Sequence, residues 1–295
     1  MPTPTSVGVG RSSRPARATF RLAMDHPAAA PPNEAPREVA VWVRELVKDY
    51  GSHRAVDHLS FEVPTGEFFG FLGPNGAGKS TTIRILCGLM RPSSGEAEVA
   101  GSDVLRDPVG VKARIGVLPE EPVLYERLSG REMLWYSGRL YGLDGATVER
   151  RSGDLLDLMG LTDTDADKAI VDYSMGMRKK IGLACALLHR PRVLFLDEPF
   201  NGIDAVTSRS IYRVLKGAVA GGMTVFFSSH VLEVAESLCT SVGIIDQGTL
   251  RALGSLTEVR EQVGASPETP LGDLFVDMVD PETRSRGEEL LEWLA

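Results

Sequence analysis

A glycine-rich stretch decides the fold of this chain, Gly73-Pro74-Asn75-Gly76-Ala77-Gly78-Lys79-Ser80-Thr81. It fits the pattern G-x-x-x-x-G-K-[ST], in which a turn brings backbone N–H groups to the phosphates of a nucleotide. An apolar strand predicted over residues 67–72 precedes it, and an apolar-periodic helix predicted over residues 79–90 follows it. A ligand-free turn is the alternative, but this context is what the phosphate-binding motif requires.

Two residues of the motif carry specific roles. Lys79 is expected to reach the β- and γ-phosphates, and the Ser80 hydroxyl to ligate Mg²⁺. The N-terminus of the following helix is expected to point at the same phosphates. The motif therefore predicts that residues 73–81 bind ATP together with Mg²⁺.

Polar residues follow two later apolar runs. Residues 193–196 end in Asp197 and Glu198, and residues 224–228 are followed closely by His230. In open α/β folds, the carboxyl ends of such strands form the ligand site. We expect Asp197 to hold Mg²⁺, directly or through water, and Glu198 to accept a proton from the attacking water. His230 is expected to bond a γ-phosphate oxygen and to orient the water or Glu198. Solvated strand ends without a ligand are the alternative.

Strand and helix patterns alternate along most of the chain, which predicts an α/β fold with a mainly parallel sheet and helices on both faces. A helical insert is predicted at about residues 128–190. The organisation is predicted as a disordered basic Pro/Ala-rich extension (1–38), one nucleotide-binding domain (39–264) and a short helical tail (265–295). A lipid-touching role for the extension stays an alternative.

Composition excludes several classes of protein. The 295 residues carry a net charge of −8, although residues 1–37 hold five arginines against two acidic residues. An acidic body argues against nucleic acid as a partner. No run of 18 apolar residues occurs, so no membrane span is expected. The cysteines Cys87, Cys185 and Cys239 form no Cys-x-x-Cys pair, which argues against zinc and disulfides and favours a reducing cytoplasm.

A further motif, Tyr173-Ser174-Met175-Gly176-Met177-Arg178-Lys179-Lys180, precedes an apolar helix about 20 residues before Asp197. By itself it fits an ordinary helix capped by serine. With the phosphate loop it resembles the signature of the ATP-binding-cassette (ABC) ATPases, in the Tyr-Ser-x-Gly-Met variant of bacterial export and multidrug-type subunits. The resemblance covers about residues 40–278 and implies a P-loop NTPase fold with an antiparallel β subdomain.

The resemblance assigns further site residues. Ser174 and Gly176 match the signature residues that face the γ-phosphate of ATP held by a second protomer. Tyr50 matches the aromatic that stacks on adenine, and Asp204 matches the acid that crosses the dimer interface. Glu120 stands where the family usually has a glutamine that contacts Mg²⁺.

The resemblance also implies partners and a place in the cell. Two copies are expected to form a homodimer around two ATP molecules, and the helical insert is expected to contact an integral membrane permease at the cytoplasmic face of the membrane. Glu120, Met175 and Met177 depart from the family's usual residues. These departures are expected to adjust the contacts across the dimer and the rate of turnover, and not to abolish ATP hydrolysis.

Other functions remain open at this point. A soluble ABC ATPase acting on nucleic acid or ribosomes would need a long coiled coil or a second motif set, which the sequence lacks. An ordinary P-loop kinase or GTPase would leave the signature unexplained. A nucleotide-gated module with low turnover is suggested by Glu120 and Met177. We expect an ATP hydrolase that drives export through a separate permease.

Overall fold

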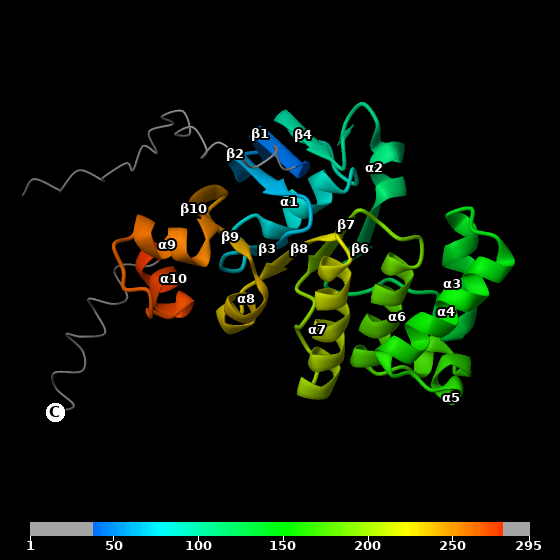
Figure 1. The fold of residues 1–295 in the computed structure, drawn as a ribbon. Coiled ribbons are helices and arrows are strands. Elements are labelled where there is room, and N and C mark those ends of the chain that lie inside the picture. Colours follow the sequence, from blue (N-terminus) through cyan, green and yellow to red (C-terminus); the bar gives the residue numbers. More distant parts are fainter. Residues whose placement is uncertain (1–37, 280–295) are drawn as a thin grey trace, which may run out of the picture. The chain divides into compact units, whose positions relative to one another are not determined.

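The computed structural model describes residues 38–279 (Figure 1). The extension predicted over residues 1–38 lies outside this part of the chain except for residue 38. The predicted C-terminal tail (265–295) lies outside it from residue 280 onward.

A six-stranded sheet forms the central layer of the described part of the chain. Its strand order is β10-β9-β3-β8-β7-β6, with all neighbours parallel except the antiparallel pair β10 and β9. The prediction of a mainly parallel sheet is confirmed. The strands are β3 (Phe68–Leu72), β6 (Ile115–Leu118), β7 (Val193–Asp197), β8 (Thr224–Ser229), β9 (Ser241–Asp246) and β10 (Thr249–Ser255).

A second, four-stranded sheet forms the antiparallel β subdomain that the family resemblance implies. Its order is β2-β1-β4-β5, and Val41 of β1 pairs with Val63 of β2 on one side and Val99 of β4 on the other. The strands are β1 (Val39–Tyr50), β2 (His53–Pro64), β4 (Ser94–Val99) and β5 (Ser102–Asp103).

Helices connect the strands, and the segment predicted to be helical over residues 128–190 divides into four helices and a short 3₁₀ turn. In Figure 1 α3, α4, α5 and α6 lie together as one group. The helices are α1 (Lys79–Leu86), α2 (Pro108–Arg114), α3 (Gly130–Leu140), α4 (Gly145–Met159), α5 (Asp163–Asp167), η1 (Ile170–Asp172), α6 (Met175–Leu187), α7 (Ala205–Ala220), α8 (Leu232–Leu238), α9 (Leu256–Gln262) and α10 (Leu271–Val279). Among residues 38–279, no helix is both long and apolar enough to cross a bilayer.

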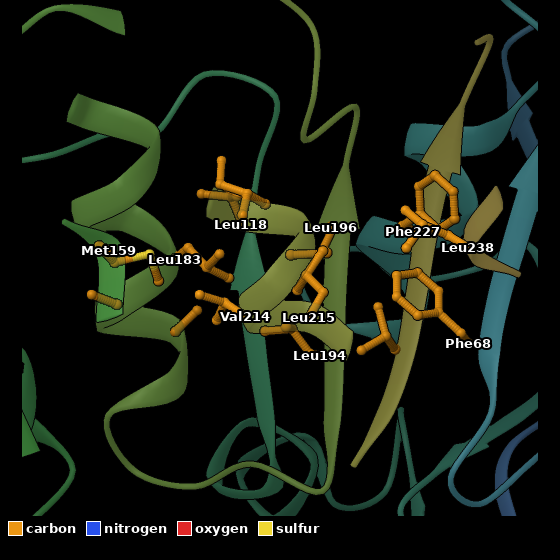
Figure 2. Close-up of a cluster of buried hydrophobic side chains, with 14 of the residues drawn as sticks. Phe68, Leu118, Met159, Leu183, Leu194, Leu196, Val214, Leu215, Phe227 and Leu238 are labelled. Atoms are coloured by element: carbon orange, nitrogen blue, oxygen red, sulfur yellow. The ribbon is translucent and has the colours of Figure 1, made fainter. Parts of the chain in front are cut away.

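The central strands are apolar on both faces because each face has its own cover. Successive side chains of a strand point to opposite faces. Phe68 and Phe227 lie in a cluster with α6, α7 and α8 (Figure 2), whereas Phe69 and Phe226 lie in a second cluster with α1 and the four-stranded sheet. Helices and sheet thus bury β3, β7 and β8 completely, which fixes the carboxyl ends of these strands in place.

The helix predicted over residues 79–90 ends four residues early, at Leu86. Gly88 has a φ of +63°, a left-handed conformation that terminates helices, and the N–H groups of Leu89 and Met90 both turn back to the carbonyl of Arg84. This correction leaves the start of α1, which follows the glycine-rich loop, unchanged.

Candidate functional site

Three polar strand ends meet at one edge of the central sheet. Strand β8 lies between β3 and β7, and all three are parallel. The loop after β3 is joined to the end of β8 by a hydrogen bond from the N–H of Gly73 to the carbonyl of Ser229 (3.4 Å). The sheet therefore brings together the glycine-rich loop, the acid pair after β7 and His230 after β8, as expected for parallel strands.

The glycine-rich loop needs its glycines for two different reasons. Gly76 and Gly78 have φ angles of +81° and +104°, which L-residues rarely adopt. A Cβ on Gly78 would also lie 2.3 Å from the carbonyl oxygen of Ala55, and one on Gly73 would lie 2.3 Å from that of Ile245. The loop is thus folded tightly against β2 and β9 before α1 begins at Lys79.

Lys79 is folded back over its own loop. Its side chain is 6% exposed, and Nζ donates to the carbonyl oxygens of Gly73 (2.7 Å) and Pro74 (3.2 Å). The same Nζ lies 3.5 Å from Oε1 of Glu198. A positive charge is therefore held between the loop and the acid pair, where phosphate oxygens can replace the carbonyl partners.

Asp197, the last residue of β7, is bonded to the start of α1 and to the end of β8. Its Oδ1 accepts hydrogen bonds from Ser80 Oγ (3.1 Å) and Ser228 Oγ (2.6 Å). The Ser228 hydroxyl in turn accepts the N–H of Glu198 (3.1 Å). Ser228 was not singled out from the sequence, although its place two residues before His230 is a signal that could have identified it.

Glu198 has an unusual backbone and a divided carboxylate. Its φ is +47°, a left-handed conformation that costs a non-glycine residue about 1–3 kcal/mol and that is found mostly at functional sites. The side chain is buried, and its Oε2 lies 3.0 Å from Nδ1 of His230. Among the described residues, its other oxygen, Oε1, has no hydrogen-bond donor, and its nearest cation is Lys79 Nζ at 3.5 Å. A buried carboxylate oxygen without a donor is suited to accept a hydrogen bond from a water molecule.

The glycine-rich loop, Glu198 and His230 help to line a cavity of about 480 Å³. It brings together ten of the residues predicted for the site: Tyr50, Asn75, Gly76, Gly78, Lys79, Ser80, Thr81, Glu120, Glu198 and His230. Gly73, Pro74 and Ala77 belong to the same loop but do not line the cavity, and Asp197 lies behind Ser80.

Three cavity residues were missed in the sequence. Asn201 lines the wall and donates from Nδ2 to Oε1 of Glu120 (2.8 Å). His53 and Ala55 come from the start of β2, close to Tyr50. His53 was left without a role, although its place three residues after the predicted adenine-stacking Tyr50 could have drawn attention to it.

The signature residues and Asp204 do not line this cavity. Ser174 is the N-cap of α6 and accepts the N–H of Met177 (3.2 Å). Asp204 is the N-cap of α7, and hydrogen bonds from the backbone and side chain of Thr207 lower the pKa of its carboxyl group. A Cβ on Gly176 would lie 3.0 Å from Thr207 Oγ1, so these two helix N-termini lie side by side.

Comparisons with known proteins identify the family to which this chain belongs. Residues 56–201 match a family model described as "ABC transporter". The linearmycin resistance ATP-binding protein LnrL of Bacillus subtilis is 40% identical over 219 residues, which cover 74% of this chain and 70% of that protein. The daunorubicin/doxorubicin resistance ATP-binding protein DrrA of Streptomyces peucetius is 37% identical over 252 residues, covering 85% and 74% respectively.

A solved structure agrees with these relatives. The structure of an ATP-binding subunit of an ABC transporter superposes with a TM-score of 0.76 at 33% identity, covering 81% of this chain and 99% of that one. The predicted fold class and family are both confirmed. The chain belongs to the ABC transporter family, as an ATP-binding subunit that hydrolyses ATP to drive transport.

Proposed function

We propose that two copies of this chain close around two ATP molecules and that each site is completed by the partner copy. The observation that carries this proposal is the division of the motifs. The cavity holds the phosphate loop, Glu198 and His230, but Ser174, Gly176 and Asp204 lie outside it. An isologous pair would bring the helix N-terminus at Ser174 to the γ-phosphate in the other copy.

Hydrolysis follows from the groups around Glu198. Its Oε1 accepts a proton from a water that attacks the γ-phosphorus, the bond to the β–γ bridging oxygen breaks, and ADP and phosphate form. His230 holds Oε2 of the same carboxylate and so fixes its orientation. Lys79 neutralises charge on the β- and γ-phosphates, for which it exchanges its present carbonyl partners.

The oxygen groups beside the phosphate loop fit Mg²⁺, which prefers oxygen ligands and keeps several waters. Ser80 Oγ and Asp197 Oδ1 are already 3.1 Å apart, and Glu120 lines the same cavity. These three residues would hold the ion, Asp197 directly or through water. When bound, Mg²⁺ would neutralise charge on the phosphate oxygens.

Tyr50 offers a surface for the adenine ring. Its side chain is 45% exposed at the edge of the cavity, and its hydroxyl donates to the sulfur of Met90 (2.9 Å). Lys48 Nζ lies 5.3 Å from the centre of the ring. A half-exposed ring held at its hydroxyl end is suited to stacking on a flat base.

The partner in the membrane and the direction of transport are also part of the proposal. The chain pairs with an integral membrane permease at the cytoplasmic face of the cell membrane, and it has no nucleic-acid partner. Both relatives described above are resistance proteins, and resistance to a compound fits outward transport.

Disulfide cross-linking tests the paired arrangement. In the proposed dimer, Asn75 in the cavity of one copy lies near Ser174 of the other copy, which does not line its own cavity. The variant Asn75→Cys/Ser174→Cys should therefore form a covalent dimer under mild oxidation when ATP is present. Burial raises the pKa of all three native thiols, that of Cys185 to about 12, so these thiols should not compete. Asn75→Cys/Lys112→Cys, with the second cysteine on exposed Lys112 of α2, is the control. Equal cross-linking of both variants would contradict the proposal.

Transport direction is tested in vesicles that hold the chain with the membrane protein that copurifies with it. ATP added on the membrane face that carries this chain should drive the transported compound to the opposite face. Movement toward the chain would contradict export while leaving ATP hydrolysis intact.

A further inference from the structure

A lysine of the signature helix is buried beside Glu198, the proposed catalytic base. Lys179 on α6 is 1% exposed, and its Nζ donates to the backbone carbonyls of Glu198 (2.9 Å) and Asn201 (2.7 Å). A lysine is almost never buried to this extent unless it is paired. Both partners are backbone atoms of one short segment, so this ammonium group contacts the acid's main chain and not its carboxylate.

That segment is a tight turn. The N–H of Asn201 donates to the carbonyl of Glu198 (3.2 Å), which closes a turn over four residues. Glu198 begins the turn with a φ of +47°, and a residue keeps such a conformation only when its surroundings enforce it. Lys179 binds the first and the last carbonyl of this turn, which are the two atoms that define its ends.

The first and last residues of the same turn, Glu198 and Asn201, line the nucleotide cavity. Glu198 carries the proposed base, and Asn201 bonds Glu120 across the cavity wall. Burial lowers the pKa of Lys179, while the carboxylates of Glu120, Glu198 and Asp197 raise it. The ammonium therefore lies in the field of the acids that serve the ATP site.

The N-terminus of α6, close to Lys179, has a different proposed role. Ser174, the N-cap of α6, lies five residues before Lys179, which is about 7.5 Å along a helix. In the proposed dimer, Ser174 contacts the ATP held by the partner copy, whereas Lys179 contacts the base that serves the chain's own ATP. One short stretch of helix thus joins the two sites.

We propose that Lys179 is a positioning residue that holds the Glu198–Asn201 turn and couples the signature helix to the catalytic base. This inference rests on the proposed function, because it needs Ser174 to contact the partner's nucleotide. Movement of α6 when the partner's ATP binds would pass through the Lys179 ammonium to the carbonyl of Glu198. The base of one site would then respond to the nucleotide of the other.

The test compares Lys179→Met, Lys179→Arg and the exposed control Lys112→Met in the full chain. Lys179→Met should lower kcat for ATP at least about tenfold, because a small displacement of a base has a large effect on rate. The Kd of a fluorescent ADP analogue should change less than about twofold, because Lys179 does not contact the phosphate loop. Lys179→Met should also weaken the cooperativity of turnover with ATP concentration, because it uncouples α6 from Glu198. Lys179→Arg keeps N–H donors and should restore most of the turnover and of this cooperativity, whereas Lys112→Met should match wild type.

Hydrogen exchange provides a readout that does not depend on turnover. Amides of residues 198–203 should exchange at least about tenfold faster in Lys179→Met than in wild type, with little change in residues 68–72. If Lys179→Met does not fold, Lys179→Gln, which keeps N–H donors on a shorter and uncharged side chain, replaces it and should give an intermediate loss of turnover.

Two results would overturn the role of Lys179. One is unchanged exchange and turnover in Lys179→Met. The other is loss of ADP-analogue binding together with turnover and no rescue by arginine, which would indicate general support of the fold. Failure of wild type to hydrolyse ATP would instead contradict the proposed function, while the exchange measurement would still test the turn.

Discussion

Nδ1 of His230 lies 3.0 Å from Oε2 of Glu198. The two residues follow neighbouring parallel strands, β8 and β7, so the sheet itself sets this distance. Oε1 of the same carboxylate accepts no hydrogen bond from the described residues and lies 3.5 Å from Nζ of Lys79. In the proposed mechanism, this contact leaves Oε1 as the oxygen that accepts the proton from water.

Removal of this histidine should slow hydrolysis without removing nucleotide. We expect His230→Ala to lower kcat about 100-fold, because Glu198 loses the contact that orients it. ATP affinity, measured by equilibrium titration, should change little because Lys79 and the phosphate loop remain. The control is His58→Ala, since the His58 side chain is exposed and hydrogen-bonds to Asp57, away from the Glu198 carboxylate. Wild-type turnover in His230→Ala would contradict this role.

Lys79 and Glu198 form a buried pair, and breaking it should destabilise the nucleotide-free protein. Lys79→Met leaves a buried carboxylate without its cation, which should lower the free energy of unfolding by about 3 kcal/mol. The double variant Lys79→Met/Glu198→Gln removes both charges and should recover much of the lost free energy of unfolding. Chemical denaturation of the single and double variants measures this coupling, and strictly additive effects would argue against the pair.

Gly78 is constrained by both its backbone angle and its neighbour, so it should tolerate alanine worse than other left-handed glycines. Gly142 has a φ of +76° with open space around it, and Gly142→Ala should lower the free energy of unfolding by about 1 kcal/mol. Gly78→Ala adds a clash with the Ala55 carbonyl and should cost about 2 kcal/mol more. Thermal unfolding of the two variants compares them directly, and equal losses would show that the loop can relax.

Acid should weaken the cap of α4. Hydrogen bonds from Thr147 lower the pKa of Asp144 below its ordinary value of 3.8. A carboxyl with a lowered pKa stabilises the fold fully above the unfolded value and loses this effect as pH falls through the folded one. Asp144→Asn keeps a good cap but no charge. Its Tm should fall below that of wild type at pH 6, and the difference should shrink below about pH 3.8; a constant difference would contradict this.

The sequence was sufficient for the phosphate loop and the strand-end acids because local patterns determine them. Five apolar residues before a glycine-rich turn predict β3 and its loop, and the run before Asp197 predicts β7. Strand adjacency in the sheet then brought His230 to Glu198, as the alternating order of elements had indicated.

Features that depend on tertiary packing were not predictable in this way. Lys179 stands between Arg178 and Lys180 and reads as part of a solvated face, and only the turn packed over α6 buries it. Asn201 gains its role from Glu120, which is 81 residues away. The missed helix α9 is different, because the capping box of Ser255 and Glu258 is visible in the sequence.

The most direct test of the account is ATP turnover by Glu198→Gln, measured together with the mass of the protein in solution. Glutamine keeps the shape of the side chain but cannot accept the proton. The account predicts that kcat falls at least about 100-fold while ATP still binds, so that a particle with the mass of two chains accumulates. Turnover at the wild-type level would show that Glu198 is not the base and would contradict the central claim.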